Sequence, residues 1–152
     1  MKIYNIKDHL EYIDEVATLT QNEWGNKSLN DKEKEEKLKK KISKIKLFLN
    51  HPSYCKLILV DHDILIGFIS IFPQDGEERT DLSPWYATMF VKEEYRGKGY
   101  SKLLNDAILK EAKKRGFKKI YLKSDLKNYY EKFGAKQIGL LENGEKLYSI
   151  DL

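Results

Sequence analysis

The sequence predicts an α/β fold in which helices pack against one sheet. Apolar residues recur with helical period in long segments, and they crowd into short β-rich runs between those segments. The chain has 152 residues, of which 41% are hydrophobic and 12% aromatic. A chain of this length buries roughly two thirds of its unfolded surface, which is enough for one core. Because no linker, repeat or low-complexity tract interrupts the pattern, we expect residues 1–152 to form a single domain.

Two amphipathic helices are predicted near the N-terminus, after a short strand at residues 3–6. Asp8 is the candidate N-cap of the first helix, which ends near Trp24. The second helix spans residues 31–50 and ends before Pro52, because proline disfavours a helical conformation in the residue that precedes it. The apolar faces contain Leu10, Ile13, Val16, Ala17 and Thr20 in the first helix and Leu38, Ile42, Ile45 and Leu49 in the second.

The middle of the chain is predicted to contain three strands. Residues 56–60 and 64–72 are β-rich runs around a tight turn and indicate a hairpin. A polar, acidic loop at 73–84 then leads into an apolar strand at 85–91.

The last third alternates between helices and strands. A helix from about Ser101 to Arg115, ended by Gly116, precedes a strand at 120–122 and a short helix at about 126–133. The final pair of strands, 136–141 and 146–150, flanks Asn143-Gly144, a dipeptide typical of hairpin turns.

Composition argues against several classes of partner. The net charge is only +4, and the lysine-rich segment 32–46 surrounds an apolar stripe, which indicates a solvated helix face and no nucleic-acid partner. Cys55 is the only cysteine, so no intrachain disulfide can form and a reducing, cytoplasmic location is expected. No signal peptide and no apolar run of about 20 residues is seen, which predicts a soluble protein with no membrane partner. The spacing of the histidines suggests no metal site.

A glycine-containing turn joins the strand 85–91 to the following helix. It reads Arg96-Gly97-Lys98-Gly99-Tyr100-Ser101. Small residues let the backbone approach a ligand, and the first N–H groups of a helix lack internal partners and lie at the positive end of its dipole. The turn therefore predicts a diphosphate site, to which Arg96 and Lys98 add positive charge; the alternative is that the glycines only shape the turn. The P-loop pattern and the dinucleotide fingerprint are both absent.

The segment 91–104 resembles the acetyl-CoA signature of the GNAT acetyltransferase superfamily, Q/R-x-x-G-x-G/A between a strand and a helix. Arg96 takes the first position and Gly99 the middle one, whereas Ser101 stands where the family has Gly or Ala. The order of the predicted elements also matches the superfamily. The resemblance implies a mixed, mostly antiparallel sheet of six to seven strands, with splayed central strands and about four helices.

The resemblance also implies acetyl-CoA as co-substrate, without a metal. The coenzyme is expected to contact the central strand and the glycine turn through Phe90, Val91, Arg96, Gly97, Lys98, Gly99, Tyr100 and Ser101. The strand would pair with the pantetheine arm and supply a backbone N–H to the developing oxyanion.

A second motif, Tyr129-Tyr130-Glu131-Lys132-Phe133-Gly134-Ala135, resembles the aromatic-Tyr-Glu-Lys-x-Gly-Phe segment of the family. Ala135 departs from its aromatic position. The resemblance assigns Tyr130 as the acid that protonates the leaving thiolate, since an ordinary tyrosine with a pKa of about 10 is protonated at neutral pH. The alternative is that Tyr130 is an amphipathic packing residue.

The acceptor side of the site is less clearly marked. Asp81, just before the central strand, is one candidate general base, although a turn or capping role is an equal alternative. Glu23, beside Trp24, is the second candidate, from the opposite wall of the site, although an ordinary surface carboxylate is the favoured alternative. Glu23 and Trp24 are expected to bind the acceptor. The acidic loop 75–81 favours a cationic acceptor through its local field.

Three functions are consistent with these observations. The first is transfer of an acetyl group from acetyl-CoA to a primary amine of a small molecule or peptide, by direct attack in a ternary complex, by a monomer or homodimer. The second is a non-catalytic acyl-CoA sensor, against which Tyr130 argues. The third is a nucleic-acid module, whose affinity would fall steeply with salt.

Overall fold

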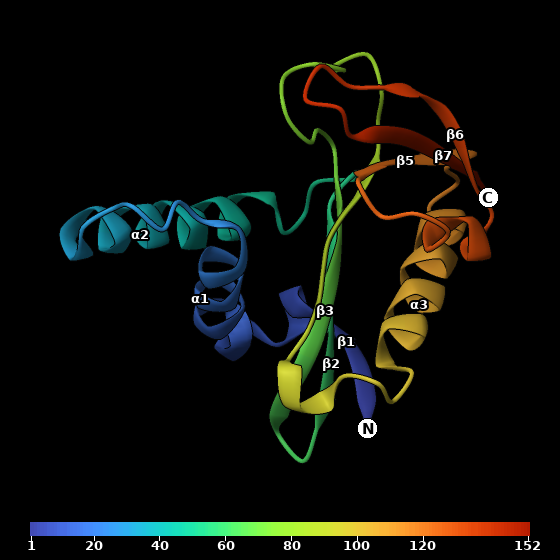
Figure 1. The fold of residues 1–152 in the computed structure, drawn as a ribbon. Helices are drawn as coiled ribbons and strands as arrows, with labels where there is room; N and C mark the ends of the chain where they lie inside the picture. Colours follow the sequence, from blue (N-terminus) through green and yellow to red (C-terminus); the bar gives the residue numbers. More distant parts are fainter.

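The elements follow the hydrophobic pattern of the sequence. The computed structural model describes residues 1–152, which form a seven-stranded sheet with helices on both faces (Figure 1). The strands are β1 (Lys2–Asn5), β2 (Cys55–Asp61), β3 (Ile64–Phe72), β4 (Trp85–Val91), β5 (Lys119–Ser124), β6 (Ala135–Leu140) and β7 (Lys146–Asp151). The helices are α1 (Ile13–Trp24), α2 (Asp31–Phe48) and α3 (Tyr100–Lys114), with short 3₁₀ turns η1 (Ile6–Asp8), η2 (Leu10–Tyr12), η3 (Glu93–Tyr95) and η4 (Tyr130–Phe133).

The strand order is β1-β2-β3-β4-β5-β7-β6, and β4 with β5 is the one parallel pair. The prediction of a mixed, mostly antiparallel sheet is therefore confirmed. The β4–β5 ladder consists of a single residue pair, Trp85 with Tyr121. Beyond that pair the strands diverge, so the sheet is split between β4 and β5 along most of the length of β4.

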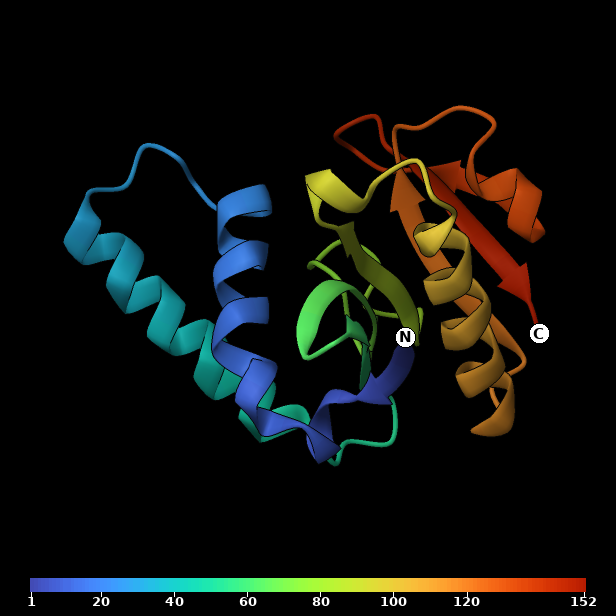
Figure 2. The same ribbon diagram turned by 90° about the horizontal axis from the view of Figure 1, so that it is seen from below.

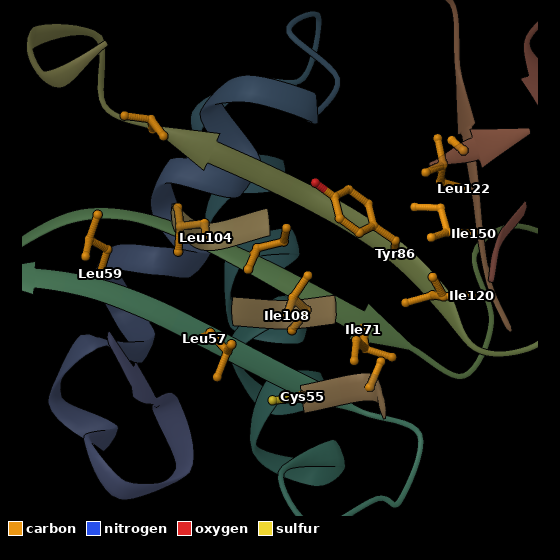
Figure 3. Packing of buried hydrophobic residues seen from close by; sticks show 14 of the residues in the cluster. Cys55, Leu57, Leu59, Ile71, Tyr86, Leu104, Ile108, Ile120, Leu122 and Ile150 are labelled. Carbon is orange, nitrogen blue, oxygen red and sulfur yellow. The ribbon is translucent and has the colours of Figure 1, made fainter. Parts of the chain in front are cut away.

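Helices α1 and α2 cover one face of the sheet and α3 covers the other (Figure 2). Alternation along β2 sends Leu57 and Leu59 toward α3, and Ile58 and Val60 toward α1 and α2. Figure 3 shows the α3 side, where Tyr86 of β4 lies among aliphatic side chains of both halves of the sheet. Two hydrophobic clusters therefore hold the helices in place on opposite faces.

The first helix begins later than predicted. Asp8 lies in η1, where the side chain of Asn5 accepts a hydrogen bond from the Lys7 N–H, and α1 starts at Ile13. His9 interrupts the helical conformation with φ −143° and ψ 63°. Leu10 consequently leaves the predicted apolar face and is 53% exposed.

The predicted helix at 126–133 is reduced to the single turn η4. The Ser124 hydroxyl accepts a hydrogen bond from the Leu126 N–H, and Asn128 has a φ of 56°. A side-chain bond of this kind competes with helix formation, and a left-handed residue ends it. The spacing of apolar residues predicted a helix here, but it carries no information on the Ser124 hydrogen bond or on the left-handed conformation of Asn128.

None of the three helices has a stretch long and apolar enough to cross a membrane.

Candidate functional site

The split in the sheet is accompanied by a bulge in β4. Phe90 pairs with Phe68 and Ala87 with Ser70, so two residues of β4, Thr88 and Met89, oppose a single residue of β3. Thr88 has a φ of 51°, in the left-handed region that β-branched residues avoid. Bulges bend the strand that carries them and re-aim its side chains. In this chain the bulge interrupts the pairing of β4 with β3, in the strand that borders the split.

A pocket of about 590 Å³ lies at the split, and we call it the gap pocket. Its wall is built from both halves of the sheet together with α1 and η4. Among its residues are Trp24, Asp75, Tyr86, Thr88, Met89, Leu122 and Tyr130. A volume of this size is typical of sites that bind small molecules or cofactors.

The glycine turn is open toward solvent. Gly97 and Gly99 have φ values of 76° and 83°, and no heavy atom lies within 4 Å of the position that a Cβ would occupy at either residue. Gly99 is the N-cap of α3 and no side chain caps this helix. The backbone N–H groups of residues 97–102 donate no hydrogen bond within the chain. These free donors lie at the positive end of a 15-residue helix, an arrangement that favours a negatively charged ligand.

Arg96 connects this turn to the end of β4. Its Nε donates a hydrogen bond of 2.8 Å to the carbonyl oxygen of Val91, and its guanidinium lies 5.6 Å from the centre of the Phe90 ring. Lys98 is exposed, with its Nζ 5.8 Å from the Tyr95 ring. The residues predicted to contact the coenzyme thus lie in one continuous path from β4 to α3.

Tyr130 lines the gap pocket from the β5 side. Its ring makes edge contacts with Tyr86 at 5.7 Å and with Tyr129 at 4.8 Å between ring centroids. Burial, with a smaller contribution from Tyr129, raises the pKa of Tyr130 to about 12. The phenol is therefore protonated at neutral pH and can act as a proton donor inside the pocket.

The two predicted base candidates are placed differently from Tyr130. Asp81 is exposed and forms two 2.9 Å hydrogen bonds with Arg79, which lower its pKa, and it is not among the residues of the gap pocket. Glu23 is exposed and also outside the lining, whereas its neighbour Trp24 lines the pocket and packs edge-on against Phe90 at 6.3 Å. The structure brings Trp24 and Tyr130 together but leaves both carboxylates outside.

Asp75 is a pocket residue that the sequence did not single out. Its carboxylate lies 3.8 Å from the Nζ of Lys123, and burial raises its pKa above the ordinary value. The rest of the acidic loop packs on the β6–β7 hairpin, where the Glu78 carboxylate accepts a hydrogen bond from the Glu142 N–H at 2.9 Å (Figure 1). No sequence signal separates Asp75 from the other acids of this loop.

Lys56 is a second residue that sequence reasoning missed. It is 2% exposed although it is a lysine, and its Nζ lies 2.6 Å from the Ser70 hydroxyl, which in turn lies 2.9 Å from that of Thr88. The signal was present: Lys56 is in phase with Ile58 and Val60, which face the helices on the buried side of β2.

Comparisons with known proteins agree with this geometry. The model of the acetyltransferase (GNAT) family matches residues 13–135. N-alpha-acetyltransferase 30 of Schizosaccharomyces pombe is 33% identical over 82 residues, which are 51% of this chain and 54% of that protein. The chain thus spans about half the length of the curated relative it matches.

Solved structures share the fold over nearly the whole chain. A structure of aminoglycoside 6'-acetyltransferase type Ii superposes with a TM-score of 0.72 at 24% identity, covering 99% of this chain and 97% of that one. The PaiA N-acetyltransferase of Thermoplasma acidophilum, in complex with coenzyme A, superposes with a TM-score of 0.64 at 22% identity over 100% of both chains. With a family match that covers most of the residues and a sheet split at the expected strands, the chain belongs to the acetyltransferase (GNAT) family.

Proposed function

We propose that this chain is an acetyl-CoA-dependent N-acetyltransferase that transfers the acetyl group to a primary amine of a small molecule or peptide. The observation that carries the proposal is the position of the gap pocket, with Tyr130 in its wall, on the same stretch of β4 that leads into the open glycine turn. A diphosphate bound at the turn would leave the rest of the coenzyme free to enter the split.

The residues present fit such a coenzyme. The unpaired N–H groups of 97–102 and the cations of Arg96 and Lys98 would hold the diphosphate. Beyond Trp85 the β5-facing edge of β4 pairs with no strand, so its backbone groups are available to the amide groups of a pantetheine arm. When bound, the coenzyme supplies a thioester as acetyl donor.

In the proposed reaction a C–N bond forms, the C–S bond breaks, the amine loses a proton and the thiolate gains one. Free N–H groups of β4 near the bulge would stabilise negative charge on the acyl oxygen. Tyr130 would donate the proton to the thiolate. Burial makes the phenol a weaker acid, but a thiolate in the same pocket is desolvated too and becomes more basic.

Asp75 is better placed than Asp81 or Glu23 to accept the proton of the amine, because Asp75 lines the gap pocket. Because burial raises its pKa, the Asp75 carboxylate is a stronger base than that of an ordinary aspartate. We therefore assign Asp75 as the general base and Trp24 as a wall of the acceptor site.

The test combines binding with turnover. Calorimetry with coenzyme A should show binding that Gly99→Val abolishes, and mixing acetyl-CoA with a panel of amines should release free thiol. Coenzyme binding without thiol release from any amine would point to an acyl-CoA sensor, and absence of coenzyme binding would reject the proposal.

A further inference from the structure

A second cavity lies on the helix-covered side of β2–β4, next to the gap pocket. It has a volume of about 480 Å³ and is lined by residues of α1, α2, the three strands and the loop that follows β3; we call it the lysine pocket. Asp75 and Thr88 line both cavities. A molecule in the lysine pocket would therefore reach the bulge of β4, where the proposed reaction takes place.

Lys56 projects from β2 into the wall of the lysine pocket and has no acidic partner. Its Nζ donates to the Ser70 hydroxyl and lies 5.2 Å and 5.4 Å from the centres of the Phe68 and Phe72 rings. No carboxylate lies within ion-pair distance. Burial, together with the charge of Lys41, lowers the pKa of Lys56 to about 7. A buried ammonium without a counter-ion is costly, and an anion in the pocket would remove that cost.

Two further lysines line the same cavity from α2. Lys41 and Lys44 form no ion pair, and burial and the neighbouring lysines lower the pKa of Lys41. Tyr54 also contributes to the lining, and its buried hydroxyl has no hydrogen-bond partner. The cavity therefore contains several hydrogen-bond donors without an acidic partner, and each of them would be stabilised by a bound anion.

The single acid in the lining is Asp75, at the end shared with the gap pocket, and it already lies beside Lys123. The charge of the cavity is consequently uneven, with cations on α2 and β2 and a carboxylate near the bulge. This arrangement disfavours the cationic acceptor that the acidic loop suggested from sequence, because its positive groups would face Lys41, Lys44 and Lys56.

We propose that the lysine pocket binds a compact anionic group, a carboxylate or phosphate, of the acceptor. The acceptor is then a small molecule that carries this group together with the amine that is acetylated. Its anion lies among Lys41, Lys44 and Lys56, and its amine lies beside Asp75 and Thr88. This assignment rests on the proposed acetyltransferase function and adds the class of its acceptor.

Matched pairs of amines test the assignment. Thiol release from acetyl-CoA is compared for alanine against alaninamide, β-alanine against β-alaninamide, and O-phosphoethanolamine against ethanolamine. The anionic member of at least one pair should have a kcat/KM about 10- to 100-fold higher, as expected for hydrogen bonds to a charged group. The first two pairs against the third distinguish a carboxylate from a phosphate.

Lys56→Met should reduce that preference to near parity while it raises the melting temperature, because the variant no longer buries an uncompensated charge. A mere packing role for Lys56 predicts the reverse, lower stability with an unchanged preference. Lys44→Met should weaken the preference without the gain in stability. Lys46→Met, an exposed lysine outside the lining, is the matched control and should leave both unchanged.

Direct binding separates failure of this assignment from failure of the acetyltransferase function. If no amine releases thiol but calorimetry shows that β-alanine or O-phosphoethanolamine binds in a Lys56-dependent manner, the anion site stands and the transfer reaction does not. If neutral or cationic amines are acetylated as well as the anionic ones in every pair, the reaction stands and the anion site is overturned.

Discussion

The Nε of Arg96 donates a hydrogen bond of 2.8 Å to the carbonyl oxygen of Val91, the last residue of β4. This bond fixes the start of the glycine turn to the end of the strand that borders the split. The same guanidinium lies over the Phe90 ring, so the turn is held from two directions. One side chain thereby holds the proposed diphosphate site in a fixed position relative to the proposed acyl site.

Arg96→Ala should weaken binding of coenzyme A by about 10- to 100-fold, because it removes both a cation and a charge-assisted hydrogen bond. Arg96→Lys keeps the charge but not the planar guanidinium, and it should recover only part of the affinity. Calorimetry at low and high salt measures both effects. Equal affinities for Arg96→Ala and the parent would show that the turn is positioned without this contact.

Ser101→Asp should raise stability and lower coenzyme affinity at the same time. A carboxylate in the first turn of α3 interacts favourably with the helix dipole, by about 0.3–1 kcal/mol. It would also occupy the N–H groups proposed for the diphosphate and repel it. Urea unfolding and coenzyme titration measure the two changes, and Ser101→Asn is the uncharged control. A variant that is more stable yet binds coenzyme A normally would place the diphosphate elsewhere.

Tyr130→Phe should lower kcat by about 10²- to 10⁴-fold, the range of general-acid catalysis, with little change in coenzyme affinity. Because the pKa of Tyr130 is raised to about 12, its proton is present well above neutral pH. Any decline of the parent activity near pH 10 should therefore persist in the variant, since it comes from another group. An unchanged kcat would leave Tyr130 as a packing residue.

Asp75→Asn should reduce kcat/KM, whereas Asp81→Asn should not. Burial raises the pKa of Asp75, and a base must be deprotonated, so the parent activity should fall as the pH drops through that raised value. The decline should begin at a higher pH than for an ordinary aspartate, and the asparagine variant should lack it. If Asp81→Asn is the impaired variant, the base assignment from the pocket geometry is wrong.

Cys55 should make stability depend on pH in the alkaline range. Burial raises the pKa of its thiol from 9.0 to about 11. The folded state therefore keeps the proton that the unfolded state loses first, and this stabilisation is complete below pH 9 and declines between pH 9 and about 11. Urea unfolding should show a steeper loss of stability over this window in the parent than in Cys55→Ala, because the raised pKa of buried tyrosines such as Tyr130 lowers the stability of both proteins above pH 10. Parallel curves would contradict the shift.

The sequence predicted the elements with strong periodicity and the glycine turn, because both are determined locally. Helix α2 and strands β2 and β3 were found within a few residues of their bounds. The short helix at 126–133 was wrong, since Asn128 and the Ser124 hydroxyl interrupt it through local bonds that apolar spacing does not register. The β4 bulge was not foreseen, because Thr88 carries no glycine-like signal for a left-handed conformation.

Two residues that line the pockets, Asp75 and Lys56, were not identified as site residues from local sequence patterns. Asp75 and Asp81 belong to the same polar loop and differ only in how that loop folds back on the β6–β7 hairpin. Lys56 could have been detected from its phase in β2, but its isolation from every acid depends on side chains from other strands and helices. Burial and pairing of this kind are set by tertiary contacts.

Because β4 and β5 are joined only by the pair of Trp85 and Tyr121, the stability of the sheet should depend on whether the acyl donor is bound. The two halves of the sheet, β1–β4 and β5–β7, are hydrogen-bonded at one end only. A ligand that lies along the unpaired edge of β4 would act as an additional strand between them. Resistance to unfolding then grows with ligand occupancy, by the mass-action relation between binding and stability. The survival of the chain in a cell would accordingly track the abundance of the acyl donor.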